Sequence, residues 1–344
     1  MINSSKPYRI LIVAPSWVGD MVMSQTLFKL LKKQYGDNCQ IDVLVNEWAI
    51  GIVARMPEVS NVLVNPFAHG ELALLKRIKL GWSLRKNHYD HVYVLPNSLK
   101  SALVPFFAGI KRRTGFVGEM RYGLLNEVFK LDKVALPKMI DRFCALANHG
   151  LRPHQIDSPS FVIDKNNQQN ILSKFSLALD LPVICLCPAA EYGQAKRWPT
   201  MHFAKLADML QDAGYQVWIV GSAKDQSIAN EIVAHATNLK RLVNLCGKTN
   251  LVDVVDLLAA AIAVVSNDSG LMHIACAIKN LNVFAIYGSS SPVFTPPLSE
   301  TARIIKIDIE CAPCFARTCQ FGHYNCLYHI TPQVLFSQLI KCSK

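Results

Sequence analysis

One carboxylate in the chain stands where it could act as a base. Asp20 ends the turn Pro15-Ser-Trp-Val-Gly-Asp20, which follows an apolar run of strand length, Arg9 to Pro15. The turn leads into 21–34, whose apolar residues have helical spacing. A carboxylate at the carboxyl end of a buried strand lies where parallel sheets bind ligands. An acid in a first helical turn also complements the helix dipole, so a structural role for Asp20 stays open.

A basic loop in the second half could bind phosphate. Lys196 and Arg197 lie in 188–199, which follows a strand predicted at 183–188. Positive charge at the carboxyl end of a strand is what a phosphate-bearing ligand requires. An exposed basic loop that binds nothing is the alternative.

A polar turn near residue 268 combines several groups that could hold an anion. The segment Val265-Ser-Asn-Asp-Ser-Gly-Leu-Met-His273 joins a predicted strand to a predicted helix. Free N–H groups at a helix start bind anions, and Gly270 lets a ligand approach the backbone closely. A helix capped by Asp268, with His273 buried for structural reasons, is the alternative. The polarity of the turn favours a ligand site made of Asp268, Ser269, Gly270, Leu271 and His273.

Two further loops follow strands of the same predicted sheet. They are Gly221-Ser222, after 216–220, and Tyr287-Gly-Ser-Ser-Ser-Pro292, after 283–287. Loops that follow successive parallel strands meet at one edge of the sheet, which predicts a single ligand site there. The chain lacks the glycine fingerprint of dinucleotide-binding domains, which disfavours a dehydrogenase.

A cluster of cysteines lies near the end of the chain, spaced Cys311-x2-Cys314-x4-Cys319-x6-Cys326. The first pair has the spacing of zinc ligands, but a second pair of that kind is missing. The sequence leaves open a structural zinc site, a loop of reduced thiols and redox-linked disulfides.

The elements that must position these residues alternate between strand and helix. This order is typical of an α/β fold with a parallel sheet, and it starts afresh after the polar region 157–170. We therefore predict two Rossmann-like domains that face a central cleft. The predicted strands are 9–15, 41–45, 62–64, 91–95, 183–188, 216–220, 263–266 and 283–287, and the predicted helices are 21–34, 72–85, 201–213, 227–236, 251–260 and 271–278.

Charge is distributed unevenly between the two halves. Residues 1–157 hold 21 Lys/Arg and 12 Asp/Glu, net +9, whereas residues 158–344 hold 15 and 13, net +2. The basic half predicts an anionic partner such as nucleic acid, a membrane surface or an acidic glycolipid. Apolar runs are too short for a membrane helix and no signal-peptide cleavage site is convincing, so we expect a cytoplasmic protein.

Over nearly its whole length the chain resembles the heptosyltransferases of glycosyltransferase family 9. Each matching motif is weak alone, but together they are specific. The matching segments are Pro15-Ser-Trp-Val-Gly-Asp-Met-Val-Met-Ser-Gln25, Met56-Pro-Glu58, 95–109, Arg113-Thr-Gly-Phe116, 118–126, Lys196-Arg-Trp-Pro199, Gly221-Ser-Ala-Lys-Asp225, Asn267-Asp-Ser-Gly-Leu-Met-His273 and the cysteine segment that ends at Gly322-His323.

The resemblance implies a GT-B fold and an inverting transfer of heptose from ADP-heptose to the first heptose of the Kdo–lipid A inner core. It implies an acceptor-binding domain at 1–165, an ADP-heptose-binding domain at 176–328, and a C-terminal helix in 329–344 that returns to the first domain. It requires no metal or cofactor. A lipid-linked acceptor leaves open peripheral contact with the cytoplasmic face of the inner membrane, and a nucleic-acid partner is not expected.

The resemblance also assigns roles to individual residues. Asp20 matches the general base, and Lys196 matches the lysine that offsets charge on the departing diphosphate. The turn Asp268 to His273 matches the donor-binding loop, where Lys196, His273 and the helix start supply positive charge or dipoles. Gly221 and Ser222 join the donor site. The residues expected to contact acceptor phosphate or carboxylate groups are Lys100, Arg113 and Arg121.

Three other functions stay open. Another transferase of the same family would add a later heptose, although the segments 97–100 and 118–126 favour the first heptose as acceptor. A nucleotide-sugar epimerase shares the architecture but needs no lipid acceptor. A nucleic-acid-binding protein would use the basic half, but no nucleic-acid motif or aromatic platform is present.

Overall fold

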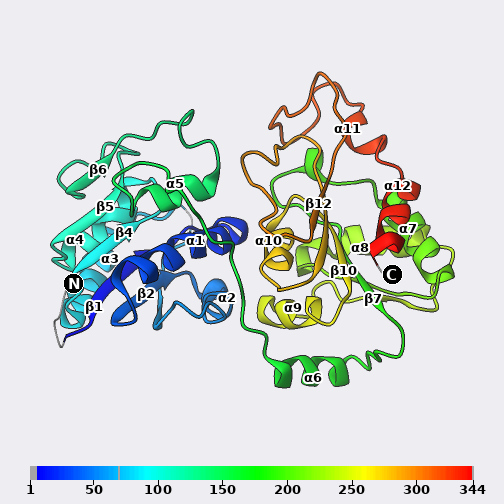
Figure 1. Ribbon diagram of the computed structural model, residues 1–344, viewed down its shortest axis with the longest axis horizontal. Helices are drawn as coiled ribbons and strands as arrows, with labels where there is room; N and C mark the ends of the chain where they lie inside the picture. Colours follow the sequence, from blue (N-terminus) through cyan, green and yellow to red (C-terminus); the bar gives the residue numbers. More distant parts are fainter. Residues whose placement is uncertain (1–5, 69, 343–344) are drawn as a thin grey trace. The chain divides into compact units, whose positions relative to one another are not determined.

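A computed structural model describes residues 6–68 and 70–342 (Figure 1). The chain forms two compact units, Met1–Pro159 and Ser160–Lys344. Each unit is a parallel sheet with helices packed on it. Within the described ranges, no helix is both long and apolar enough to cross a membrane.

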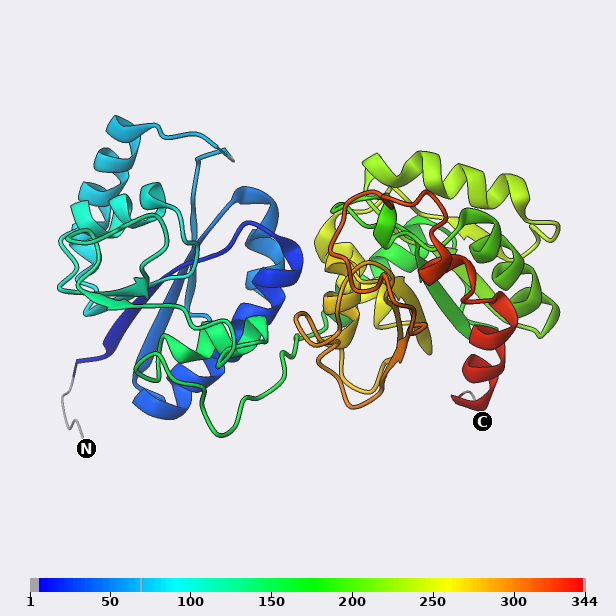
Figure 2. The same cartoon turned by 90° about the horizontal axis from the view of Figure 1, so that it is seen from above.

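In the described part of the first unit, six parallel strands form one sheet in the order β3-β2-β1-β4-β5-β6. Its central strand β1, Tyr8–Val13, is buried over its last four residues, as expected of a strand covered on both faces. The helices α1 and α5 pack together, as do α3 and α4, and Figure 2 shows the two pairs on opposite faces of the sheet. The other strands are β2 Cys39–Val45, β3 Asn61–Val64, β4 His91–Val94, β5 Arg112–Phe116 and β6 Glu127–Phe129, and the helices are α1 Val18–Tyr35, α2 Ile50–Val53, α3 Leu74–Leu84, α4 Leu103–Phe107 and α5 Met139–Ala145.

The second unit repeats this arrangement, with the described strands in the order β12-β11-β10-β7-β8-β9. Counted from the first strand of each unit, both sheets have the order 3-2-1-4-5-6 of a doubly wound Rossmann fold. The strands are β7 Val183–Cys187, β8 Gln216–Ile219, β9 Leu242–Asn244, β10 Ala263–Asn267, β11 Asn282–Ile286 and β12 Ala302–Ile305. The helices are α6 Lys165–Lys174, α7 Thr200–Asp212, α8 Gln226–His235, α9 Leu251–Leu258, α10 Gly270–Cys276, α11 Asn325–Tyr328 and α12 Pro332–Cys342.

The shared strand order places a possible ligand site in each unit. The order reverses between β1 and β4 in the first sheet and between β7 and β10 in the second. Ligands of such sheets bind at the carboxyl ends of the two strands that flank the reversal. Each of these strand ends carries one of the loops singled out in the sequence.

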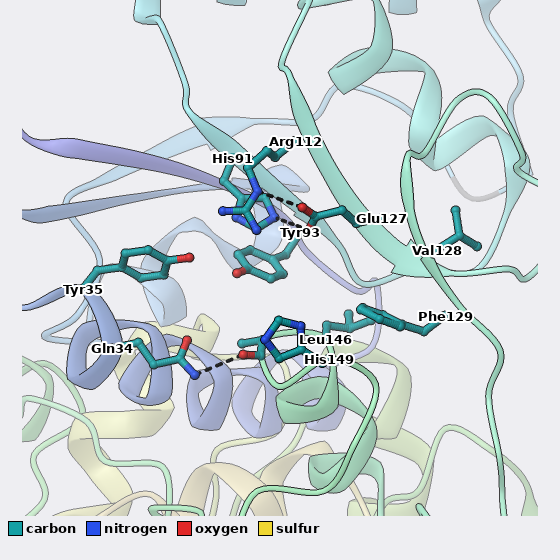
Figure 3. Close-up of a pocket in the computed structure, with 11 residues that line it drawn as sticks. Gln34, Tyr35, His91, Tyr93, Arg112, Glu127, Val128, Phe129, Leu146 and His149 are labelled. Atoms are coloured by element: carbon teal, nitrogen blue, oxygen red, sulfur yellow. Dashed lines mark hydrogen bonds and ion pairs between the residues drawn. The ribbon is translucent and has the colours of Figure 1, made fainter. Parts of the chain in front are cut away.

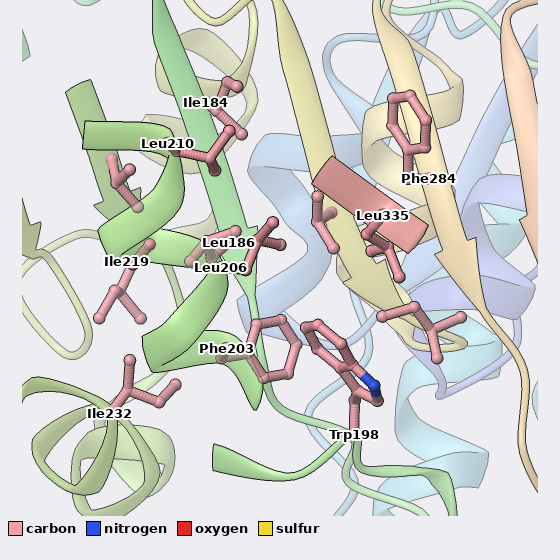
Figure 4. Packing of buried hydrophobic residues seen from close by; sticks show 14 of the residues in the cluster. Ile184, Leu186, Trp198, Phe203, Leu206, Leu210, Ile219, Ile232, Phe284 and Leu335 are labelled. Carbon is pink, nitrogen blue, oxygen red and sulfur yellow. The ribbon is translucent and has the colours of Figure 1, made fainter. Parts of the chain in front are cut away.

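The core of the second unit includes the C-terminal helix. Leu335 and Leu339 of α12 are fully buried, and Leu335 belongs to the same core cluster as Trp198 and Phe203 (Figure 4). The indole Nε1 of Trp198 donates to the carbonyl of Ile330 at 2.8 Å, which fixes the chain just before α12. The return to the first domain that the resemblance implied for 329–344 stays a prediction. The division into 1–165, 176–328 and 329–344 stays a prediction.

The polar segment at the expected domain boundary is a helix. Asp164 caps α6 by accepting hydrogen bonds from the backbone N–H groups of Asn166 and Asn167, both at 3.0 Å. Asn167 and Gln168 then donate to Asp256 of α9, each at 2.7 Å. This helix was not predicted from the sequence. Side-chain amides make much of its contact with α9, so the segment lacks a clear apolar stripe.

Candidate active site

The ends of β7 and β10 bring Lys196 and Asp268 into contact. Lys196 ends the 3₁₀ turn Gln194–Lys196 that follows β7, and Asp268 follows β10 directly. Lys196 Nζ donates to Asp268 Oδ2 at 2.6 Å, and only 16% and 4% of the two side chains are exposed. A charged pair this buried is stable only because each charge neutralises the other.

A buried asparagine holds the lysine loop in place. Asn267 Nδ2 donates to the carbonyl of Pro188 at 2.6 Å, and Asn267 Oδ1 accepts from the backbone N–H of Trp198 at 3.0 Å. One side-chain amide therefore fixes both ends of the loop that carries Lys196. This role could not be predicted, because an asparagine in a polar turn is equally compatible with a surface position.

Ser269, not Asp268, caps the helix that follows β10. The backbone N–H of Met272 donates to Ser269 Oγ at 3.5 Å, while Asp268 lies against Lys196 and, at 3.5 Å, Thr295 Oγ1. The alternative interpretation of Asp268 as the cap of α10 is therefore wrong. Gly270 begins α10 and Leu271 is half-buried beside it.

His273, which the resemblance assigned to the donor-binding loop, is buried. Burial is the main reason that the pKa of His273 is lowered to about 4; Asp268 opposes this shift, and Lys196 contributes to it. The imidazole is therefore neutral near pH 7. Lys196 is left as the cation of this cluster, and its charge is offset by Asp268.

Two buried hydroxyl groups lie beside the lysine turn. Ser289 and Ser290 follow β11 and are 1% and 5% exposed, and neither Oγ has a hydrogen-bond partner among the described residues. The backbone N–H of Ser289 donates to the carbonyl of Ala195 at 3.2 Å, one residue from Lys196. Their loop, 287–292, was predicted from the sequence to lie at a ligand site, but these two serines were not singled out. An unpaired buried hydroxyl is costly, which makes both serines candidates for ligand contact.

The other predicted donor residues, Gly221 and Ser222, lie in the loop that follows β8 and have local structural contacts. Ser222 Oγ donates to Asp225 Oδ2 at 2.7 Å and caps a 3₁₀ turn. A Cβ at Gly221 would lie 2.9 Å from Cys246 Sγ, so the backbone there is closely packed. The described hydrogen bonds do not connect either residue to Lys196 or Asp268.

The first unit has a cavity of about 690 Å³ at the carboxyl ends of β1 and β4. Asp20 is half-buried, is the third residue of α1, and lines this cavity. The backbone of α1 places the carboxylate there because α1 begins directly after the turn that leaves β1. The cavity is also lined by Trp17, Asn46, Asn65, Arg77, Asn97, Lys100 and Glu119.

The two arginines expected at the acceptor site hold loops in this structure. Arg121 is fully buried and donates to the carbonyls of Pro96 and Phe116, both at 2.6 Å. Arg113 donates to the carbonyls of Ile110 and Leu124, also at 2.6 Å. Of the three residues expected to contact the acceptor, only Lys100 lines the cavity.

A second cavity of the first unit, of about 540 Å³, lies at the opposite edge of its sheet (Figure 3). His91, Arg112 and Glu127 begin β4, β5 and β6 and line it. Arg112 Nε lies 2.8 Å from Glu127 Oε1, and His91 Nε2 lies 2.7 Å from Thr114 Oγ1. Because ligands of doubly wound sheets bind at the carboxyl edge, we assign this cavity no part in the active site.

The buried His91 predicts a loss of stability in acid. Burial lowers the pKa of His91 to about 4, Arg112 adds to the shift and Glu127 opposes it. Below pH 6.5, His91 becomes protonated in the unfolded chain but stays neutral in the folded chain until the pH approaches 4. The free energy of unfolding therefore falls as the pH falls. We expect His91 to contribute a loss of about 2 kcal/mol between pH 7 and pH 5. Denaturant unfolding at both pH values should show a smaller loss for His91→Gln, whose amide can still reach Thr114. An unchanged pH dependence would contradict this prediction.

Comparison with known proteins identifies the family. The model of glycosyltransferase family 9 (heptosyltransferase) matches residues 77–325. The chain is 47% identical to lipopolysaccharide heptosyltransferase 2 of Escherichia coli K12 over 341 residues, which cover 96% of this chain and 97% of that protein. The chain belongs to glycosyltransferase family 9. It is also 43% identical to lipooligosaccharide heptosyltransferase 2 of Haemophilus ducreyi, over 97% of this chain and 100% of that protein.

Solved structures support the same assignment and show the GT-B fold. The structure of E. coli ADP-heptose LPS heptosyltransferase II has a TM-score of 0.86 at 44% identity, covering 97% of this chain and 98% of that one. A family 9 glycosyltransferase of Veillonella parvula shares the fold at 17% identity, with a TM-score of 0.82 and coverage of 98% and 97%. The matched range of the family 9 model includes Lys196 and Asp268 but not Asp20. The role of Asp20 therefore stays a prediction, and the observation that bears on it is its place in the cavity.

Proposed function

We propose that this family 9 protein is an inverting heptosyltransferase. It moves L-glycero-D-manno-heptose from ADP-heptose to the first heptose of the lipopolysaccharide inner core, on Kdo–lipid A. The observation that carries this proposal is the 47% identity to lipopolysaccharide heptosyltransferase 2 over 96% of the chain. In this proposal the reacting side chains come from the loops at the reversal points of the two sheets, which carry Asp20 and the Lys196–Asp268 pair.

In the proposed reaction Asp20 accepts the proton of the acceptor hydroxyl while that oxygen attacks the anomeric carbon of the donor. The bond between the anomeric carbon and the diphosphate oxygen breaks, and ADP departs with its electrons. Because one displacement forms one bond and breaks another on opposite faces of the sugar, the configuration inverts. Lys196 offsets the charge that develops on the departing diphosphate.

To offset the charge of the diphosphate, the Lys196 ammonium group must contact it in addition to Asp268 or in its place. In the structure its ammonium group is 2.6 Å from Asp268 Oδ2. The diphosphate must share or replace this contact, while Asp268 keeps Lys196 extended toward the donor loop. The turn Asp268 to His273, with the buried hydroxyls of Ser289 and Ser290, then completes the proposed donor site.

The acceptor side of the proposal uses the first unit. Its net charge of +9 over 1–157 suits a phosphorylated, acidic glycolipid, and Lys100 lines the same cavity as Asp20. Because the proposed acceptor is lipid-linked, the proposal includes peripheral contact with the cytoplasmic face of the inner membrane.

The test is transfer with defined substrates. Purified protein is incubated with ADP-heptose and heptosyl-Kdo-lipid A, and ADP release and product mass are followed. A mass gain of one heptose with an equal amount of ADP is expected. Donor binding without transfer would assign a different acceptor, and turnover of donor without acceptor would point to an epimerase. Failure to bind ADP-heptose would overturn the proposal.

A further inference from the structure

The segment Cys311–Cys326, here called the cysteine segment, lies directly against the turn that carries Lys196. The backbone N–H of Ala195 donates to the carbonyl of Arg317 at 3.0 Å. A Cβ added at Gly193 would clash with that carbonyl oxygen, so glycine is required for this approach. The two stretches are more than a hundred residues apart in sequence and touch through their main chains.

The same segment also touches the loop that carries the buried serines. The backbone N–H of Phe315 donates to the carbonyl of Ser289 at 2.7 Å, and Tyr192 Oη donates to the carbonyl of Phe315 at 2.7 Å. The cysteine segment is therefore part of the wall of the site that contains Lys196. Its sequence had suggested only zinc binding or thiol chemistry. Within the described residues no group of three or more His, Cys, Asp or Glu side chains is arranged to hold a metal ion.

Two cations share one aromatic ring at this wall. Lys196 Nζ lies 5.1 Å from the centroid of the Tyr192 ring, and Arg317 Cζ lies 5.2 Å from it. Both cations therefore lie beside the same side chain, Tyr192. Arg197, the other cation of the turn, directs its Nε to the carbonyl of Ala190 at 3.1 Å.

Lys196 alone does not supply enough positive charge at this wall to neutralise a bound diphosphate. Lys196 already faces Asp268, so the pair contributes little net charge. A nucleoside diphosphate brings at least two negative charges. Arg317 is exposed and forms no ion pair with any described residue, so its guanidinium is available for an anionic ligand. A guanidinium also matches the geometry of a phosphate, to which it can donate two parallel hydrogen bonds.

We propose that Arg317 is a second cation of the donor site and binds the diphosphate of the nucleotide sugar. This inference rests on the proposed function, because it assigns a further contact to the same donor. The cysteine segment supplies the residue and, through the carbonyl of Arg317, sets its distance from Lys196. Because that contact belongs to the main chain, a substitution of the Arg317 side chain removes the charge and keeps the segment in place.

The test is calorimetric titration of the full chain with ADP and with AMP. Arg317→Gln should weaken ADP binding about tenfold, since a hydrogen bond to a charged group is lost. AMP has one phosphate fewer, so we expect its affinity to change much less. Arg317→Lys should recover part of the ADP affinity, because it restores the charge without the bidentate geometry. With ADP-heptose as substrate, Arg317→Gln should raise KM more than it lowers kcat.

Arg303→Gln is the matched control, because Arg303 also lies over an aromatic ring, 5.7 Å from the centroid of Phe284, but on β12. It should bind ADP as the unmodified protein does. Equal ADP affinity of the unmodified protein and Arg317→Gln would overturn the inference. An equal loss of ADP and AMP affinity would also overturn it, because it would show a structural role. If the unmodified protein failed to bind ADP, the proposed function itself would fall.

Discussion

Lys196→Ala is expected to lower kcat/KM for heptose transfer by about 10²–10³-fold, the usual effect of removing one group that stabilises a departing charge. The same change leaves Asp268 buried at 4% exposure without its ionic partner, 2.6 Å away in the intact site. We therefore also expect a loss of about 3 kcal/mol in the free energy of unfolding, since breaking a buried pair strands a charge. Steady-state kinetics and denaturant unfolding measure the two effects separately.

Two further variants separate chemistry from stability. Asp268→Asn in the Lys196→Ala background should restore most of the stability, because no buried charge remains, without restoring transfer. Lys306→Ala is the control for losing an ion pair as such, because Lys306 also lies 2.6 Å from a carboxylate, Asp308, but both are exposed. It should cost well under about 1 kcal/mol. Normal kinetics in Lys196→Ala would remove Lys196 from the mechanism.

Asp20→Asn is expected to lower kcat by about 10²–10⁴-fold while ADP binding is kept, because the amide cannot accept the acceptor proton. The loss should be larger in kcat than in KM for either substrate. The measurement is transfer at saturating acceptor, with ADP affinity determined by calorimetry on the same preparation. Transfer at the normal rate would keep the family assignment and exclude Asp20 as the base.

The competing explanation for Asp20 is its position in the first turn of α1, where a carboxylate stabilises the helix dipole. Asp253 is a matched control, since it is the third residue of α9 as Asp20 is the third residue of α1. Asp253→Asn should reduce stability by about 1 kcal/mol or less and leave kcat unchanged. If both variants lost only stability, Asp20 would be a helix-terminal residue like Asp253.

Much of the fold could be predicted because buried parallel strands leave continuous apolar runs. The strand predicted at 263–266 lies within β10, and the helix predicted at 201–213 corresponds to α7. The strands that escaped prediction carry weak signals. β5 begins with two arginines and contains a glycine, whereas β9 has three residues, all half-buried. Such strands are recognisable only when a neighbouring strand is available for pairing.

The site was predictable where polar residues follow a strand, but not where charge depends on burial. The turn from Asn267 to His273 was visible because a strand, a polar run and a helix follow in order. His273 is neutral because it is buried, and Arg121 donates its hydrogen bonds to main-chain carbonyls. Both facts follow from tertiary packing, which no local sequence pattern reveals. The contact between Gly193 and Arg317 likewise joins segments that only the folded sheet brings together.

The way the Lys196 cluster is assembled has a consequence for folding. Its contacts join four stretches of chain, around residues 195, 268, 289 and 316, and the Lys196–Asp268 pair alone spans 72 positions. Contacts of such high sequence separation form late, because much of the chain must be ordered before they close. A nucleotide that requires all four stretches would bind the native second unit and not its partly folded forms. Bound nucleotide would therefore raise the unfolding free energy of that unit by RT ln(1 + c/Kd), where c is the concentration of free ADP, and ADP titrations would report on intact folding as well as on the active site.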